Sequence, residues 1–422
     1  MELLVQFHDR ACGQLTIDNA QRMSFEYLPD YLESGGPPIS VVMPLRHGSW
    51  PDAVTFAFFE NLLPEGRIRQ LIASRLGTAD NNFRRLLQQT GGDVAGAISL
   101  VNADQDDLPV SLPEPLALTD QTLGQVLEQI KTEPFLTGNQ QGMRLSLAGA
   151  QNKLPVVIDA EDQIRLPGSQ ISTHIIKPPS EQYPALVENE VLCMRAAARA
   201  GINVPETALR TFIGPDGQYR DCYVVRRYDR KTVEHGTVRL HQEDLCQITG
   251  IVSACKYVQD GGPGFAELFS AVRQYTRPAA LYQQELVKRF LYNLLIGNQD
   301  AHGKNFSLLH GDRGISLSPA YDLVSTLVYP DLQDRFAMPI GDAWRIQELD
   351  ANAMSRFQQL TGIQLKRQTR LLQRFVDNAA RSVAQEAELL KDLTFHDTHT
   401  TLDRIVQLVR NHAVLLHQWL GA

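Results

Sequence analysis

The sequence has few cysteines, few aromatic residues and no long hydrophobic run. Its five cysteines are scattered over 422 residues, as Cys12, Cys193, Cys222, Cys246 and Cys255. Their odd number and wide spacing, with no zinc-type cluster, exclude a disulfide scaffold and favour reduced thiols. No stretch approaches about 18 uncharged apolar residues, and the N-terminus has no basic region before an apolar core. We therefore expect a soluble, cytoplasmic protein without a signal peptide or a membrane span.

An excess of positive charge is also missing. Asp and Glu number 48 and Lys and Arg 40, so the formal net charge is −8. An acidic chain does not bind nucleic acid over its whole surface. Hydrophobic residues make up 43% and charged residues 21% of the chain, which excludes wholesale disorder and collagen-like classes. At about 150 residues per domain, the length predicts two or three domains.

The first hundred residues predict a small α/β module. Alternating apolar residues predict strands at 3–7 and 13–17, and a third strand is expected at 41–45. Residues 53–63 have the apolar spacing of a helix, which we expect residues 64–66 to end. An Asp- and Pro-rich stretch at 100–115 then indicates a linker.

The rest of the chain predicts a β-rich part followed by a helical part. Strands are expected at 145–148, 154–158, 173–177 and 222–225, and a helix at 184–200. Beyond residue 242, apolar stripes predict buried helices over 286–295, ended by Gly297, and over 402–416. The fold class is therefore α+β: a small N-terminal α/β module, then a β-rich lobe and a helical lobe. The boundaries that we expect are 1–105, 106–228 and 229–422.

A polar loop follows the expected buried helix and contains the strongest chemical signal. Asp300 and Asn305 stand five residues apart, as in a D-x-x-x-x-N catalytic loop. Phosphate transfer to a hydroxyl needs a carboxylate to accept or orient its proton and hard oxygen ligands for magnesium. Lys304 could neutralise a γ-phosphate, and His302 is the one histidine singled out. A solvated loop with an aspartate helix cap is the alternative interpretation.

A second acidic residue is expected to return to this loop. Residues 307–309 and 315–317 alternate around a Gly-rich turn and predict a hairpin. Such a hairpin would bring Asp322 beside Asn305, where the two side chains could bind one metal ion. A helix cap at Asp322 is the alternative.

A lysine and a glycine-containing loop complete the set of candidate site residues. Lys177 ends an apolar strand, so its ammonium needs a partner, for which Glu190 is favoured over Glu188. The segment 146–153 has small residues and a lysine, as suits a loop whose backbone approaches phosphate. An exposed strand end and an ordinary hairpin turn are the respective alternatives.

Together these segments resemble the HipA family of serine/threonine protein kinases, the toxin half of HipA–HipB toxin–antitoxin modules. The resemblance extends from the first strand to near the C-terminus. It rests on ten segments in the same order: residues 58–64, 92–97, 147–153, 172–177, 187–190, 227–230, 241–247, 256–264, 297–307 and 321–322.

The resemblance implies an ATP site with magnesium. Asp300 resembles the catalytic base, and Asn305 and Asp322 resemble the metal ligands. Lys177, which pairs with Glu190, resembles the lysine that binds the ATP phosphates. The implied nucleotide-site residues are Ala148, Gly149, Ala150, Gln151, Asn152 and Lys153 in the phosphate loop, Arg226, Arg227 and Tyr228 in the hinge, and His302, Gly303, Lys304 and Tyr321 around the catalytic loop.

The resemblance also implies regulation and partners. Ser146 falls where the family autophosphorylates and inactivates itself. The usual substrate is an aminoacyl-tRNA synthetase, glutamyl-tRNA synthetase above all. A HipB helix-turn-helix antitoxin would bind the N-terminal module, and operator DNA would be reached only through that antitoxin, which would place the bound complex at the nucleoid.

Three residues depart from the expected loop: Gln299, Ala301 and Gly303. Two alternatives stay open beside a toxin kinase, and the altered loop motivates only the first. One is a nucleotide-binding co-repressor with impaired catalysis, and the other is a small-molecule kinase.

Overall fold

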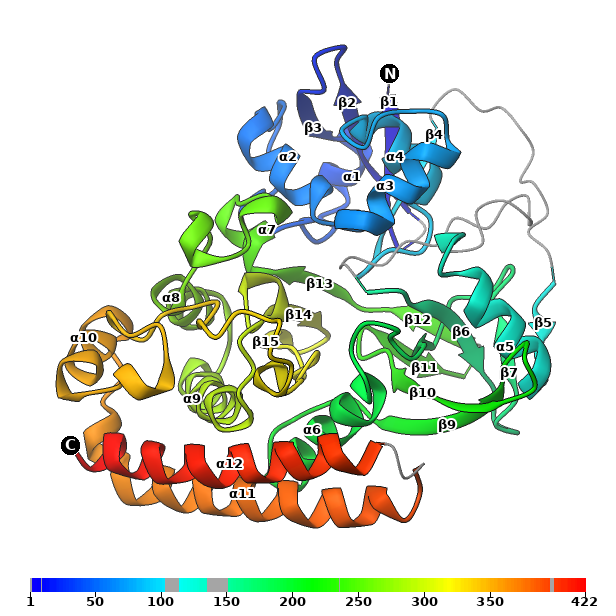
Figure 1. The fold of residues 1–422 in the computed structure, drawn as a ribbon. Coiled ribbons are helices and arrows are strands. Elements are labelled where there is room, and N and C mark those ends of the chain that lie inside the picture. Colours follow the sequence, from blue (N-terminus) through cyan, green and yellow to red (C-terminus); the bar gives the residue numbers. More distant parts are fainter. Residues whose placement is uncertain (1, 9, 103–113, 135–150, 235, 395–397) are drawn as a thin grey trace.

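The computed structural model describes residues 2–8, 10–102, 114–134, 151–234, 236–394 and 398–422 (Figure 1). The strand expected at 145–148 and most of the expected linker lie outside these residues.

The N-terminal module is built on a four-stranded antiparallel sheet in the order β3-β2-β1-β4. Side chains of β1 alternate, and Leu3, Val5 and Phe7 are buried in the hydrophobic core of the module. The strands are β1 (Glu2–Phe7), β2 (Arg10–Ile17), β3 (Met23–Tyr27) and β4 (Ile98–Asn102), and the helices are α1 (Pro29–Glu33), α2 (Asp52–Glu60), α3 (Gly66–Arg75) and α4 (Phe83–Thr90).

One local prediction for this module is wrong, and another is confirmed except for where the helix ends. Residues 41–45 form turns and not a strand, because the Tyr27 hydroxyl binds the backbone at Ile39 and Met43 and holds the segment in a loop. The helix expected over 53–63 ends at Glu60, and Gly66, expected to stop it, instead begins α3. At residues 41–45 a tertiary contact therefore outweighs local propensity.

The next part is a six-stranded antiparallel sheet in the order β5-β7-β6-β8-β10-β9. It confirms the strands predicted at 154–158, 173–177 and 222–225. Two helices, α5 (Asp120–Gln129) and α6 (Leu186–Arg199), pack on it. The strands are β5 (Leu116–Ala117), β6 (Leu154–Ile158), β7 (Ile164–Leu166), β8 (His174–Lys177), β9 (Thr207–Ile213) and β10 (Tyr219–Arg226).

The remainder is mainly helical, as predicted. Helix α9 is buried along its second half, and Gly297 ends it with a φ of +65°, a left-handed conformation that suits glycine. The helices are α7 (Leu245–Thr249), α8 (Phe265–Tyr275), α9 (Ala279–Ile296), α10 (Ala351–Thr361), α11 (Thr369–Lys391) and α12 (His399–Gly421).

Two small sheets interrupt this helical part. The predicted hairpin is confirmed as β14 (Ser307–Gly311) and β15 (Gly314–Leu317), and β13 (His241–Asp244) adds a third strand that was not predicted. A separate pair, β11 (Arg230–Val233) and β12 (Gly236–Arg239), precedes them.

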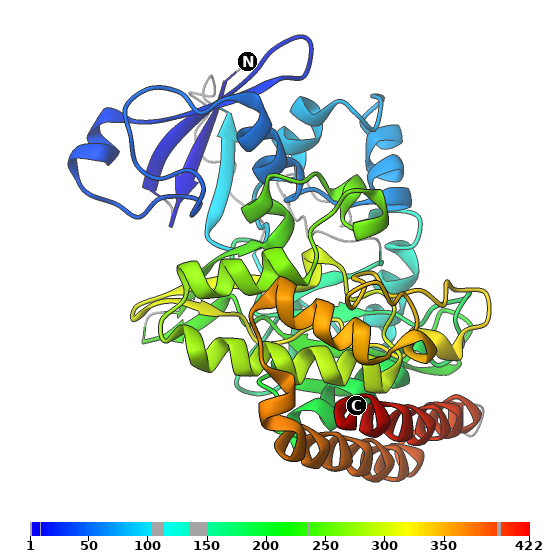
Figure 2. The same ribbon diagram turned by 90° about the vertical axis from the view of Figure 1, so that its left-hand side faces the viewer.

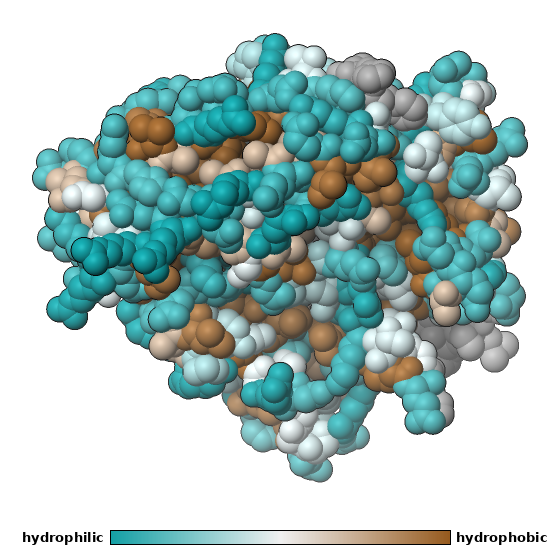
Figure 3. All heavy atoms as spheres, turned by 90° about the horizontal axis from the view of Figure 1, so that it is seen from below, coloured by the Kyte–Doolittle hydropathy of each residue, from teal (hydrophilic) through white to brown (hydrophobic). Residues whose placement is uncertain are grey.

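The three parts share two hydrophobic cores. One core joins the N-terminal sheet to β6, β8 and β10, and the other joins α6 to the helical part. Two perpendicular views place the N-terminal module at one end of the molecule and the α11–α12 pair at the other (Figures 1 and 2). Seen from the α11–α12 end, the surface is mostly hydrophilic with scattered apolar patches (Figure 3). No helix within the described ranges is long and apolar enough to span a membrane.

Candidate active site

A cleft of about 850 Å³ lies between the six-stranded sheet, the helical part and the N-terminal module. Its size is in the range of small-molecule sites. Of the predicted site residues, Ser146, Ala148, Gly149 and Ala150 fall outside the described residues. Those that line the cleft are Gln151, Asn152, Lys153, Lys177, Glu190, Arg226, Arg227, Tyr228, Asp300, His302, Lys304, Asn305, Tyr321 and Asp322.

The loop after α9 carries Asp300 and Asn305. The backbone N–H of Asp300 donates to Asn298 Oδ1 at 3.1 Å, and Asn305 Nδ2 donates to the Asp300 carbonyl at 2.9 Å. These bonds fix the loop and leave the amide oxygen of Asn305 available. The Asp300 side chain is 54% exposed, and its Oδ1 accepts a 2.6 Å hydrogen bond from the Tyr257 hydroxyl. Asp300 is therefore both oriented and accessible.

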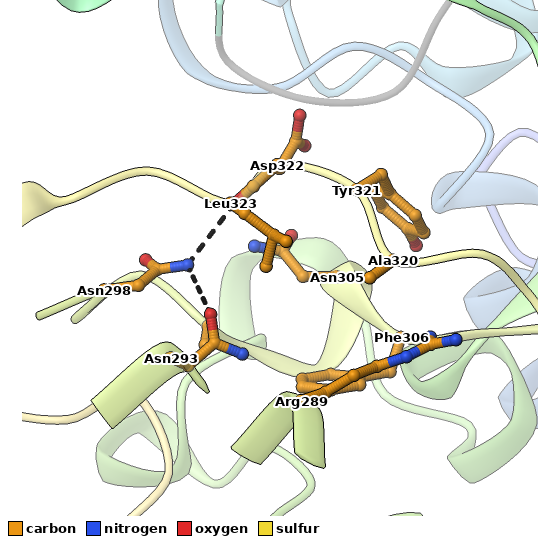
Figure 4. A pocket seen from close by; sticks show the side chains of 10 residues that line it. Arg289, Asn293, Asn298, Asn305, Phe306, Ala320, Tyr321, Asp322 and Leu323 are labelled. Carbon is orange, nitrogen blue, oxygen red and sulfur yellow. Dashed lines mark hydrogen bonds between the residues drawn. The ribbon is translucent and has the colours of Figure 1, made fainter. Parts of the chain in front are cut away.

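Asp322 returns to this loop after the β14–β15 hairpin, as predicted. Asp322 and Asn305 line one small pocket and lie beside each other in Figure 4. Asn298 Nδ2 bridges Asn293 Oδ1 and the backbone carbonyl of Asp322. Asp322 has a φ of +52°, which is strained for a residue other than glycine. Such strain is concentrated at functional sites.

Lys177 occupies a buried position between two carboxylates. It is 5% exposed, and its Nζ lies 2.6 Å from Glu190 Oε1 and 2.6 Å from Asp322 Oδ1. The predicted pairing with Glu190 is confirmed. Burial alone would lower the pKa of Lys177, but the carboxylates of Asp322 and Glu190 raise it, so the ammonium is charged. Burial would raise the pKa of Asp322, yet Lys177 and Lys153 lower it to about 2.

The segment that links β10 to β11, residues 227–229, has two different roles. The Arg227 guanidinium binds Asp229 at 2.8 Å and the Ser172 hydroxyl at 2.9 Å, in a buried network that includes Asp93 of the N-terminal module. The Tyr228 ring stacks on Tyr321, with centroids 5.5 Å apart. The Arg227 side chain thus fixes this segment to the N-terminal module, and the aromatic pair borders the cleft.

His302 and Gly303 form the tightly packed part of the loop. His302 is 5% exposed, its ring packs against Tyr257, and burial lowers its pKa to about 4. At Gly303 an added Cβ would lie 2.7 Å from Pro263 and 2.9 Å from Cys246. Gly303 therefore permits a close approach that a larger residue would prevent.

Acidification should destabilise the protein through His302. Its pKa is depressed from 6.5 to about 4 on folding, so only the unfolded chain takes up a proton as the pH falls below 6.5. The neutral, buried His302 therefore makes its full contribution to the free energy of unfolding above pH 6.5. About 2 kcal/mol of that free energy is lost by pH 5. The His302→Gln variant should lack this loss when unfolding by denaturant is compared at pH 7 and pH 5.

The exposed His47 supplies the matched control. His47→Gln should keep the full pH dependence of the wild type. An unchanged pH dependence in His302→Gln would show that the histidine is protonated in the folded protein.

No pattern in the sequence indicated an active-site role for Tyr257 or for residues of the N-terminal module. Lys304, predicted to face a phosphate, has its Nζ 3.0 Å from Asn61 Oδ1 and 3.1 Å from Glu65 Oε1. The resemblance includes the segments of Tyr257 and Asn61, which was the only available signal. Contacts across about 240 residues cannot be read from local patterns.

A two-lobed fold whose cleft combines a buried lysine–glutamate pair, an Asp/Asn loop and a returning aspartate is a kinase-like fold. Comparison with protein families matches residues 3–101 to the HipA N-terminal domain and residues 145–388 to the HipA-like C-terminal domain. The chain belongs to the HipA family.

Individual relatives agree with this assignment. The protein Y4mE of Sinorhizobium fredii is 38% identical over 397 residues, which cover 93% of each chain. The serine/threonine-protein kinase toxin HipA of Shewanella oneidensis is 32% identical over 372 residues, 84% of this chain and 82% of the relative. A solved complex of HipA, HipB and operator DNA from Shewanella oneidensis matches with a TM-score of 0.82 and 27% identity, over 99% of this chain and 97% of that one.

Proposed function

We propose that this chain is an ATP- and magnesium-dependent serine/threonine protein kinase that acts as the toxin of a HipA–HipB type module. The observation that carries the proposal is Lys177, whose ammonium lies 2.6 Å from both Glu190 and Asp322 at the wall of the cleft. The Lys177–Glu190 pair resembles the lysine–glutamate pair by which kinases hold a lysine for the ATP phosphates.

The residues around Asp322 suit a magnesium ion. The carboxylate of Asp322 and the amide oxygen of Asn305 are hard oxygen donors, which magnesium prefers. The low pKa of Asp322 keeps its carboxylate ionised at neutral pH. A bound magnesium ion would supply neutralisation of the charge that develops on the transferred phosphate.

The remaining site residues bind and orient the reactants. Asp300 is exposed to the cleft and would accept the proton of the acceptor hydroxyl, while Lys177 and Lys153 would bind phosphate oxygens. Burial lowers the pKa of Lys153 to about 8, so anionic phosphate would favour its charged form. Tyr228 and the backbone of Arg226 and Arg227 would border the adenine.

The partners follow from the relatives. The Shewanella oneidensis HipA is named as a kinase toxin, and its structure is a complex with HipB and operator DNA. We propose a HipB-like helix-turn-helix antitoxin for this chain, bound through the module at 1–105, with DNA contacted through the antitoxin. The kinase lobes would comprise 106–228 and 229–422. The substrate would be an aminoacyl-tRNA synthetase of the cytoplasm, and Ser146 would be the autophosphorylation site.

A panel of purified aminoacyl-tRNA synthetases tests the substrate class. With radiolabelled ATP and magnesium, label should enter one synthetase, glutamyl-tRNA synthetase being the first candidate, and chelation of magnesium should abolish the transfer. Small hydroxyl compounds in parallel reactions serve as the competing acceptor class. Label on a small compound and on no synthetase would overturn the toxin proposal in favour of a small-molecule kinase.

A further inference from the structure

The segment 60–65 of the N-terminal module lies at the candidate active site. It begins at the last residue of α2 and contains two acidic residues, Glu60 and Glu65, that are only 2% and 7% exposed. Buried carboxylates need cationic or hydrogen-bonding partners. Glu60 pairs with Arg69 of the same module, and both carboxylates also have partners in the helical part, about 190 to 240 residues further along the chain.

Glu65 lies between two lysines from different segments. Its Oε2 accepts a 2.7 Å hydrogen bond from Lys256 Nζ, and its Oε1 lies 3.1 Å from Lys304 Nζ. Burial alone would raise the pKa of Glu65, but Lys304 and Lys256 lower it to about 2. The carboxylate is therefore ionised at neutral pH and is shared by two cations.

Each of these lysines is followed in the sequence by a residue that binds Asp300. Lys256 precedes Tyr257, whose hydroxyl donates to Asp300 Oδ1 at 2.6 Å. Lys304 precedes Asn305, whose side chain binds the Asp300 carbonyl at 2.9 Å. One carboxylate thus binds two separate segments, each of which contacts Asp300.

Neighbouring residues of the module reinforce this arrangement. Lys304 Nζ donates to the backbone carbonyl and to the Oδ1 of Asn61, both at 3.0 Å. Asn61 Nδ2 also donates to the Ile251 carbonyl at 2.8 Å. Glu60 accepts from the Ser253 backbone N–H at 2.8 Å and from its hydroxyl at 2.7 Å. The segment 251–256 and the catalytic loop are therefore both docked on the module.

We infer that Glu65 is a positioning residue for the loop of Asp300 and Asn305, so that the N-terminal module forms part of the active site. Its catalytic consequence rests on the proposed kinase function. Without this carboxylate, Lys256 and Lys304 lose their common anion, and the loop that they hold shifts. A displacement of about 1 Å in reacting groups lowers a rate by about 10²-fold.

The test compares Glu65→Gln with Glu26→Gln in the full-length chain. Glu26 is exposed on β3 of the same module, away from the cleft lining, and is the matched control. The readouts are kcat, KM for ATP, and amide hydrogen exchange of residues 298–306. Glu65→Gln should lower kcat by about 10- to 100-fold with little change in KM for ATP, and should speed exchange in the loop. Glu65→Asp, which keeps the charge, should recover part of kcat.

Three results would decide the positioning role of Glu65 and distinguish its failure from a failure of the proposed kinase function. Unchanged kcat and unchanged exchange in Glu65→Gln would overturn the positioning role. A wild type that transfers no phosphate would refute the proposed kinase function, and the exchange measurement alone would then decide the positioning role. If Glu65→Gln does not fold, Lys256→Met gives the same comparison, and unaltered exchange in that variant would contradict the inference.

Discussion

Replacing Asp300 by asparagine should lower the rate of phosphate transfer by about 10²- to 10⁴-fold, the range that a general base contributes. Asparagine has the same size, and it can still accept the hydrogen bond that Tyr257 now donates to Asp300. It cannot take up the proton of the acceptor hydroxyl. Because the Asp300 side chain is 54% exposed, the substitution should not change the folding of the loop.

The measurement pairs transfer of radiolabelled phosphate with binding of magnesium-ATP. Asp300→Asn should retain nucleotide binding, since the proposed phosphate and metal contacts come from other residues. Asp312→Asn, at an exposed carboxylate in the β14–β15 turn, is the matched control and should keep full activity. Transfer by Asp300→Asn at the wild-type rate would exclude Asp300 as the base.

Replacing Lys177 by methionine should reduce both stability and activity. The substitution leaves Glu190, whose side chain is 2% exposed, as a buried carboxylate without its lysine. Breaking a buried pair in this way costs about 3–5 kcal/mol. The variant should also bind ATP more weakly, because Lys177 is the proposed phosphate ligand. Denaturant unfolding measures the first effect and nucleotide titration the second.

The ion pair of Lys231 and Asp312 lies at the surface and is the matched control for the buried pair of Lys177 and Glu190. Its Nζ–Oδ2 distance is also 2.6 Å, but its side chains are 49% and 79% exposed. Lys231→Met should therefore cost less than about 1 kcal/mol. Adding Glu190→Gln to Lys177→Met should restore part of the stability, because the unpaired charge is removed. Equal losses for the two lysine variants would show that Lys177 is not a buried ion-pair partner.

Features set by local patterns were predictable from the sequence. The apolar spacing in α9 and the glycine that ends it are local, and so is the turn of the β14–β15 hairpin. The Lys177–Glu190 pair was also accessible, because a lysine that ends a buried strand needs a charged neighbour, and the next helix supplies it.

Features set by long-range contacts were not predictable. The segment 41–45 has an apolar, strand-like composition, but the hydroxyl of Tyr27 holds it as a loop. Lys304 has the position of a phosphate-binding lysine in the loop, yet the structure gives its ammonium partners in Asn61 and Glu65. No periodicity in the sequence indicates which distant carboxylate a lysine will meet.

The roles of the site residues in catalysis stay predictions. The geometry brings Asp300, Asn305, Lys177 and Asp322 to one cleft, as the resemblance implied. Ser146 and the first residues of the expected phosphate loop lie outside the described residues.

Intact-mass spectrometry after incubation with magnesium-ATP tests the central claim most directly. The wild type should gain the mass of one phosphate, and Asp300→Asn and Ser146→Ala should each gain none. A wild type that arrives phosphorylated should first be treated with phosphatase and then regain the phosphate. A wild type that starts unmodified, binds ATP and gains nothing would contradict the account and identify the chain as a nucleotide-binding protein without kinase activity.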